Sequence, residues 1–245
     1  MHSNTYTLTF AAIITIVCGL ILGGASQGLK DKQVTNADVD VKSKVLMAFG
    51  EYNTELKNPE ILSFFGEGFE GTVVESITID SEGKITDTAG QNIVLRKEMK
   101  KKDETTRNYP LYVLKKEGKT AGYAFPIQGA GLWSICHGFL ALEADASTIK
   151  GIIYYEHAET PGLGGEIADN QAWVDQFKGK SILDKGGKLA APQSTKNAAE
   201  FENPNKYWAI SGATFTLDGV NTMLTDFSIV YNNYLSTKRI LKEAK

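Results

Sequence analysis

The sequence predicts an α+β fold, with a single N-terminal transmembrane helix followed by one soluble domain built on an antiparallel sheet with flanking helices. Three observations support this. Residues 7–25 form an uncharged apolar segment, short β-branched runs alternate with turn residues through the middle of the chain, and an amphipathic helical stripe occupies its end. Because the predicted strands adjoin one another, we expect antiparallel pairing. A chain of 245 residues is long enough for one sizeable core.

The N-terminal apolar segment is long enough to cross a membrane. At 1.5 Å per residue, residues 7–25 nearly span the ~30 Å hydrocarbon layer. A cleaved signal peptide is disfavoured because no Lys or Arg precedes the segment. A lipid anchor on Cys18 is disfavoured by the bulky Val17 before it. We therefore predict a tail at residues 1–6, an anchor at 7–29, a helical stalk or linker at 30–58 and a soluble domain at 59–245.

The charges beside the anchor leave its orientation open. Lysines follow the segment and none precedes it, which by the positive-inside rule would place the domain in the cytoplasm. That rule is weaker for long translocated domains. Acidic residues are also interleaved among the lysines: Lys30, Asp31, Lys32, Asp38, Asp40, Lys42 and Lys44.

Runs rich in β-branched residues, separated by turn residues, predict the strands of the domain. We expect strands at residues 71–80, 111–115, 120–125, 138–143 and 148–155. The second and third flank Lys116-Glu117-Gly118-Lys119 and predict a hairpin. The last two flank Asp145-Ala146-Ser147 and predict a second antiparallel pair.

Three further segments predict helices: residues 39–49, ended by Gly50, then 170–177 and 217–241. The last is the clearest because its apolar residues repeat at i, i+3, i+4 and i+7. They are Leu217, Val220, Met223, Leu224, Phe227, Val230, Tyr231 and Tyr234.

Composition argues against several classes of function. The net charge of −3 and the pI of about 5.7 do not indicate a nucleic-acid binder. Two cysteines, Cys18 and Cys136, make no disulfide framework. We expect no metal site, because the histidines lack the spacing of ligands. They are His2, His137 and His157.

The start of the C-terminal helix is a candidate site for an anion. Residues 211–216, Ser-Gly-Ala-Thr-Phe-Thr, place hydroxyl groups where a helix presents unpaired N–H groups and the positive end of its dipole. A threonine hydroxyl there is also suited to form an ester with a phosphate. The ordinary alternative is a plain N-cap. The acidic Asp218 in the first turn favours that alternative, because it already satisfies the dipole.

Two glycine-rich loops add candidate ligand contacts. Residues 157–166 contain three glycines and a proline, a composition that lets backbone approach a ligand closely. No G-x-G-x-x-G dinucleotide fingerprint is present. Residues 129–134 place Trp133 in a second glycine loop. Trp133 is either an ordinary core residue or a wall for a flat aromatic ligand.

Together, three segments resemble the NqrC family, the C-type subunit of the bacterial sodium-translocating NADH:quinone reductase: GLWSxxxGFLAL at 131–142, ETPGLGGEI at 159–167 and SGATFT at 211–216. The anchor followed by GLKDKQ at 28–33 is similar too, so the resemblance covers nearly the whole chain. ETPGLG and SGAT are shared with the G-type subunit of the Rnf electron-transport complex and with other FMN-binding domains. The GLWS segment favours the sodium pump.

The resemblance implies a covalent cofactor and its site. It implies FMN joined through its phosphate to Thr214 by a flavin transferase that uses FAD. The candidate ring contacts are then Trp133, Glu159, Thr160, Leu163 and Gly164, while Ser211, Gly212 and Ala213 shape the phosphate turn. No catalytic acid, base or nucleophile is implied. One position departs from the transferase motif, because Trp208 stands where an Asp usually precedes the serine by three residues.

The resemblance also implies partners and a location. The chain would relay electrons between redox centres of partner subunits in a six-subunit membrane complex. It would be a single-pass protein of the bacterial inner membrane, with its domain on the periplasmic side, against the lysine count. The alternatives are the corresponding Rnf subunit and a membrane-anchored binding module without a redox role, in which Thr214 is only an N-cap.

Overall fold

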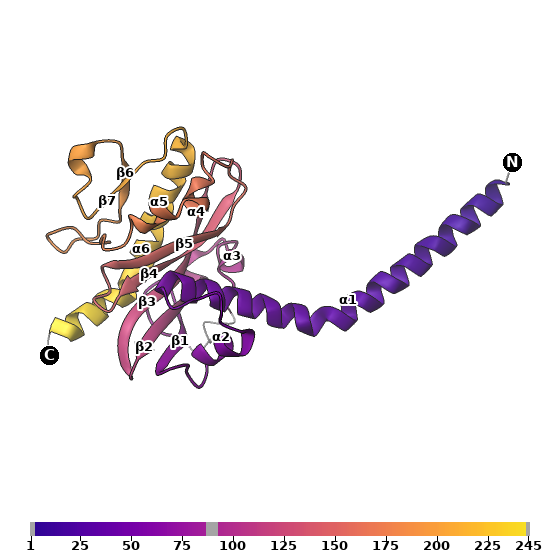
Figure 1. Ribbon diagram of the computed structural model, residues 1–245, viewed down its shortest axis with the longest axis horizontal. Helices are drawn as coiled ribbons and strands as arrows, with labels where there is room; N and C mark the ends of the chain where they lie inside the picture. Colours follow the sequence, from indigo (N-terminus) through magenta and orange to yellow (C-terminus); the bar gives the residue numbers. More distant parts are fainter. Residues whose placement is uncertain (1–2, 87–92, 244–245) are drawn as a thin grey trace. The chain divides into compact units, whose positions relative to one another are not determined.

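The computed structural model describes residues 3–86 and 93–243 and confirms the predicted α+β architecture (Figure 1). The chain divides into two compact units, Met1–Val41 and Lys42–Lys245. His2 lies outside the described residues. The second unit contains the sheet and all the candidate site residues.

Helix α1, Asn4–Phe49, supplies the first unit and continues into the second. Among the described residues, it is the one helix long and apolar enough to cross a membrane. Its large apolar side chains between residues 8 and 22 are exposed, which suits a lipid environment. The helix is longer than the predicted segment 39–49 and runs through residues 30–38 without a break. The domain boundaries at residues 7, 30 and 59 stay predictions.

The last turns of α1 belong to the core of the second unit. Leu46 and Phe49 are fully buried there. The helix ends as predicted at Gly50, whose φ of 74° is the left-handed conformation that favours glycine. The Gly50 N–H donates to the Met47 carbonyl at 3.0 Å and the Glu51 N–H donates to the Leu46 carbonyl at 2.9 Å. These two bonds form a Schellman C-cap.

The sheet has five antiparallel strands in the order β1-β2-β3-β4-β5. The strands are β1 Thr72–Ile79, β2 Tyr109–Lys116, β3 Lys119–Ala130, β4 Ile135–Glu143 and β5 Ile149–Glu156. All five predicted strands are therefore confirmed, and each is longer or shorter than predicted by a few residues at its ends. The β2–β3 turn consists of Glu117 and Gly118, with φ values of 49° and 75°. This is the type I′ geometry that matches the twist of a hairpin.

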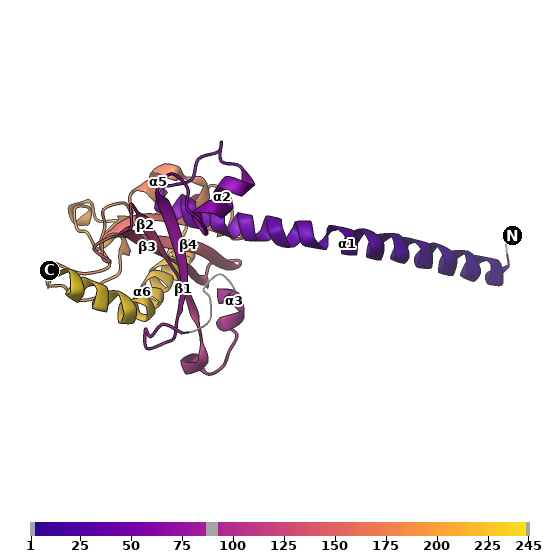
Figure 2. The same ribbon diagram turned by 90° about the horizontal axis from the view of Figure 1, so that it is seen from below.

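Helices cover both faces of the sheet (Figure 2). Helix α6, Thr214–Glu243, packs its apolar stripe on one face, and the last turns of α1 pack near Gly122 and Gly151 on the other. The end of β3 meets α6 backbone to backbone. A Cβ atom at Gly219 would lie 1.7 Å from the Ala130 carbonyl oxygen, so this position accepts only glycine. The glycine at position 219 therefore allows the backbone of α6 to pack directly against the end of β3.

The remaining elements are short. They are α2 Asn58–Phe64, α3 Leu95–Glu98, η2 Glu104–Thr106, α4 Glu166–Asp169, α5 Gln171–Asp175, β6 Gln193–Thr195, η3 Ala198–Glu200 and β7 Lys206–Trp208. Helix α5 confirms the prediction at 170–177, and its N-cap is Asn170, which accepts from the Trp173 N–H at 3.2 Å. The parallel pair β6–β7 was not predicted, because three-residue strands carry too little periodicity.

Candidate functional site

Three loops meet at the end of the sheet where β3 turns into β4. They are the β3–β4 loop, the loop after β5 and the loop before α6. Together they line a cavity of about 30 Å³ formed by Leu132, Trp133, Glu159, Thr160, Leu163, Gly164, Gly212, Ala213, Phe215 and Thr216. The structure thus brings seven predicted site residues to one place. Leu132, Phe215 and Thr216 are additional residues that the sequence analysis did not select.

A buried carboxylate connects the three loops. Glu159 is only 5% exposed. Its Oε1 accepts from the N–H groups of Trp133 at 2.9 Å and Ser134 at 3.3 Å. Its Oε2 accepts from the Leu132 N–H at 3.0 Å and from the Thr216 hydroxyl at 2.6 Å. We call this arrangement the Glu159 hub: the Glu159 carboxylate, the three N–H groups of residues 132–134 and the Thr216 hydroxyl.

Two glycines leave the room that the Glu159 hub occupies. A Cβ atom at Gly131 would lie 2.5 Å from Glu159 Oε1. A Cβ atom at Gly164 would lie 2.5 Å from the Thr216 hydroxyl oxygen and 2.8 Å from Glu159 Oε2. Neither separation is compatible with a side chain. The glycines of two motifs are therefore explained by close approach to one carboxylate.

The hydrogen bonds of the hub favour the ionised form of Glu159. Burial by itself raises the pKa of the carboxyl group. The Thr216 hydroxyl and the N–H groups of Trp133, Leu132 and Ser134 lower the pKa by more, so the net shift is downward. The nearby thiol of Cys136 has a pKa raised to about 12, first by burial and then by the charge of Glu159.

The start of α6 leaves donor groups unused. Gly212 has a φ of 78°, and the first helical bond runs from the Leu217 N–H to the Ala213 carbonyl at 3.0 Å. Ala213 is thus the N-cap residue, and its methyl group cannot accept a hydrogen bond from the N–H groups of the first turn. Within residues 3–86 and 93–243, the N–H groups of residues 214–216 have no hydrogen-bond partner.

Thr214 is therefore the first residue of the helix and not its N-cap. Its side chain is exposed, and its hydroxyl makes no hydrogen bond to any described residue. The plain N-cap interpretation of Thr214 is corrected by this geometry, because the helix begins three residues earlier than predicted. Thr214 lines a neighbouring cleft of about 430 Å³ that also contains Lys196 and Asp218. Ser211 is exposed in the turn before the helix.

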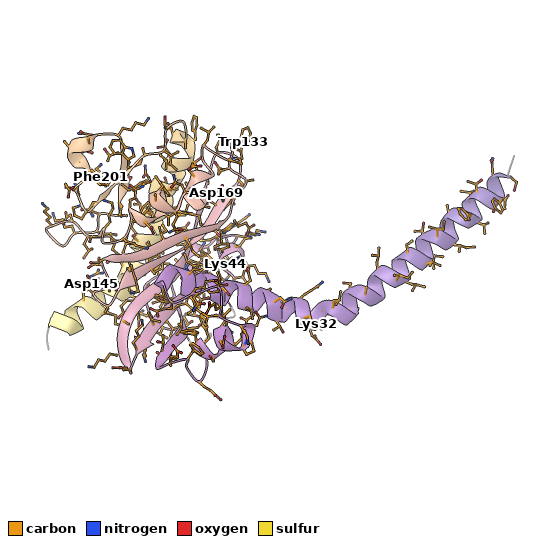
Figure 3. All side chains as sticks on the ribbon, viewed as in Figure 1. Lys32, Lys44, Trp133, Asp145, Asp169 and Phe201 are labelled. Carbon is orange, nitrogen blue, oxygen red and sulfur yellow. The ribbon has the colours of Figure 1, made fainter. Side chains whose placement is uncertain are left out.

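Apolar side chains around the cavity face solvent. Trp133 is 69% exposed and Phe215 is 71% exposed, while Leu132 and Leu163 are about half exposed. Figure 3 shows Trp133 at the edge of the domain. Trp133 is thus not the ordinary core residue considered as an alternative. Exposed apolar clusters of this kind are typical of binding surfaces.

Some of the missed residues left a signal in the sequence. Thr216 stands four residues before Val220, on the apolar stripe of the helix, where a polar side chain needs a buried partner. Leu132 and Phe215 lie beside predicted residues inside the same motifs. No local pattern, however, indicates that these segments share one carboxylate.

His137, His157 and the backbone of Trp208 make contacts within the fold. His137 is buried and contacts the Arg96 guanidinium at 3.0 Å, and His157 Nδ1 accepts from the Glu159 N–H at 3.2 Å. No group of three potential metal ligands occurs in the described part of the chain. The Trp208 carbonyl accepts from the Trp173 indole N–H at 2.8 Å, so its backbone is fixed while its ring stays partly exposed.

Comparison with known proteins gives consistent matches. The family described as FMN-binding domain matches residues 131–227. The C-type subunit of the Na(+)-translocating NADH-quinone reductase of Vibrio vulnificus strain YJ016 is 33% identical, over 87% of this chain and 86% of its own. The subunit of the same name from Pseudomonas aeruginosa PAO1 is 30% identical, over 91% of this chain and 90% of its own.

Two crystal structures are similar to this chain over most of its length. The C-type subunit of the Na(+)-translocating NADH-quinone reductase of Parabacteroides distasonis ATCC 8503 has a TM-score of 0.72 and 26% identity, covering 85% of this chain and 97% of its own. NqrC of Shewanella oneidensis has a TM-score of 0.66 and 27% identity, covering 85% and 98%.

Proposed function

Because this chain belongs to the NqrC family, the C-type subunits of the Na(+)-translocating NADH-quinone reductases, we propose that it carries FMN as a phosphoester on Thr214 and relays electrons within that complex. Family membership makes it a subunit of an oxidoreductase complex with an FMN-binding domain. It also favours this assignment over the Rnf subunit and over a binding module without a redox role. The attachment residue, the ring contacts and the relay are the content of the proposal.

The observation that carries the proposal is the free hydroxyl of Thr214. An ester bond needs an accessible oxygen that is not committed to the fold, and this hydroxyl is exposed and unbonded within the described residues. The unpaired N–H groups of residues 214–216 suit the remaining charge of a phosphodiester. A diester carries one negative charge, which limits its repulsion by Asp218. The residues present therefore fit the phosphate of FMN.

The exposed apolar residues fit the flavin ring. The enclosed cavity of about 30 Å³ is too small for a ring system, so the ring would rest against side chains at its rim. Trp133 and Leu163 present such surfaces, and Thr160 and Gly164 line the same cavity. Aromatic stacking adds to the energy of area burial. A tether to Thr214 makes this docking intramolecular, so a modest surface suffices.

The chain itself has no need of a catalytic acid, base or nucleophile. FMN, when bound, supplies the redox chemistry. The residues of the chain would bind and orient the group: Trp133 would cover a face of the ring and the first turn of α6 would hold the phosphate, while Glu159 fixes the loop that carries the tryptophan. The Gly212 turn lets the backbone reach the phosphate without a clashing side chain.

The proposal includes a location and partners. Residues 7–29 of α1 would be the membrane anchor, with the domain outside the cytoplasm, where a flavin transferase attaches FMN from FAD. The partners are the other membrane subunits of the six-subunit complex. Trp208 stands where the transferase motif usually has an acid, and its backbone is held by Trp173 and Gln176.

The test is a denaturing gel of the full chain, produced with and without a flavin transferase. We expect a fluorescent band with the transferase, and mass spectrometry should place the FMN mass on the peptide that contains Thr214. Thr214→Ala should remove the fluorescence, while the matched variant Ser211→Ala should keep it. A dark wild-type band in the host with the transferase, or a bright Thr214→Ala band, would overturn the proposal.

A further inference from the structure

We propose that Glu159 is a positioning residue that locks the loop of Trp133 to the start of α6, and whose fixed negative charge sets the reduction potential of the flavin. This inference rests on the proposed function. It differs from the role that the resemblance implies for Glu159, which is direct contact with the ring. The carboxylate instead acts through the groups it holds.

The partners of the carboxylate are far away in the sequence. The donors of the β3–β4 loop precede Glu159 by 25 to 27 residues, and Thr216 follows it by 57. A single side chain therefore joins three segments that are distant in the sequence. Thr216 stands two residues after Thr214 in the same helical turn. The wall formed by Trp133 and the residue that carries FMN are thus fixed relative to each other.

The Glu159 carboxylate is held in one position and orientation by the groups around it. Both oxygens accept two hydrogen bonds each, which fills most of their acceptor capacity. Gly131 and Gly164 bring backbone against it where a Cβ atom would clash. Charge-assisted bonds of this kind are stronger than neutral ones. The charge is therefore held in one place beside the cavity.

A fixed anion has a definite effect on a neighbouring electron acceptor. Glu159 lines the same cavity as Trp133 and Leu163, so its charge acts on any ring docked there. Adding an electron next to a negative charge is unfavourable, and water screens the interaction little when the charge is buried. Removing the charge should therefore raise the reduction potential of the flavin.

The experiment compares the flavinylated full chain of the wild type with Glu159→Gln, Thr216→Val and Thr216→Ser. The matched control is Glu166→Gln, a charge removal seven residues after Glu159, at the first residue of α4, whose carboxylate makes no hydrogen bond to the described residues. We expect a positive shift of the midpoint potential and a changed visible circular dichroism of the flavin in Glu159→Gln. Thr216→Val should change the circular dichroism alone, Thr216→Ser should restore it, and the control should match the wild type.

A second measurement does not depend on the flavin. In protein produced without the transferase, hydrogen exchange at residues 131–135 and 217–220, the first hydrogen-bonded N–H groups of α6, should accelerate together in both Glu159→Gln and Thr216→Val. If Thr214 carries no flavin in the wild type, the proposed function fails while this measurement still tests the lock. Unchanged exchange in both variants would overturn the positioning role. An unchanged potential in flavinylated Glu159→Gln, or an equal shift in the control, would overturn the role of the charge.

Discussion

Asp145 and Glu159 are two carboxylates with the same kinds of hydrogen-bond donors. The donors to Asp145 are near it in the sequence, whereas the donors to Glu159 are distant. Asp145 accepts from the N–H groups of Ser147 and Thr148, both at 2.8 Å, and from the Thr148 hydroxyl at 2.5 Å. Glu159 also accepts from backbone N–H groups and one threonine hydroxyl, but its donors come from two distant segments. Asp145 and the Trp133 loop that Glu159 holds lie at opposite ends of β4 (Figure 3).

The difference separates a local turn from a tertiary junction. Asp145 closes the β4–β5 turn within three residues, an arrangement that any Asx turn achieves. Glu159 instead holds together loops that the packing of α6 on the sheet brings close to one another. Exposed apolar side chains also line the junction: Leu132, Trp133, Leu163 and Phe215. A carboxylate with local partners shapes the fold, whereas one with distant partners assembles a site.

The largest expected effect is on stability when each carboxylate is removed. Glu159→Ala leaves four donors without their acceptor in a buried place and should lower the free energy of unfolding by about 3 kcal/mol. Asp145→Ala leaves donors that water reaches and should cost about 1 kcal/mol. Urea unfolding of the full chain in detergent measures both. Equal losses would show that the two carboxylates stabilise the fold to the same extent.

The next effect tests the space around the junction. Gly164→Ala places a Cβ atom 2.5 Å from the Thr216 hydroxyl and should destabilise the chain by about 2 kcal/mol. Gly66→Ala is the matched control, because it also has an ordinary φ and would meet nothing closer than 3.9 Å. That control should change stability by less than about 0.5 kcal/mol in the same assay. A neutral Gly164→Ala would mean that the junction is loosely packed.

A smaller effect appears in the dependence of stability on pH. Hydrogen bonds outweigh the effect of burial and lower the pKa of the folded state for both Asp145 and Glu159. Their contributions are complete above the unfolded pKa values of about 4 and are lost as the pH falls through the lower, folded values. The stability difference between wild type and Glu159→Gln should therefore shrink from pH 7 to acid. A difference that stays constant would show that the charge of Glu159 is not involved.

The smallest effect is chemical labelling at Cys136. Burial and the charge of Glu159 raise the pKa of this thiol to about 12, so only about one thiol in ten thousand is ionised at pH 8. The folded chain should leave Cys136 unmodified by iodoacetamide, as mass spectrometry of its peptide would show. Glu159→Gln should label faster, whereas Asp145→Asn should behave as the wild type. Labelling of the folded wild type as fast as in urea would contradict the buried geometry.

The sequence predicts those parts of the molecule that depend on neighbours in the chain. The strands, the Glu117-Gly118 turn, the Asp145 turn and the stripe of α6 follow from local patterns, and the structure confirms them. The segments of the site were identified through a family resemblance. Their junction at Glu159 was not predicted, because hydrogen bonds between residues 25 to 57 positions apart leave no periodic trace. The first residue of α6 was missed because its N-cap is an alanine.

The contact between Gly219 and the Ala130 carbonyl determines which substitutions in α6 the protein can accept during evolution. This contact lies little more than one helical turn beyond Thr214. It therefore fixes the distance between the first turn of α6 and the sheet independently of the rest of the helix. Substitutions farther along α6 can alter the packing around its C-terminal part without displacing the site at its first turn. The same contact means that position 219 tolerates no residue other than glycine. Even a methyl group there would push α6 away from the sheet and shift all the residues of its first turn together.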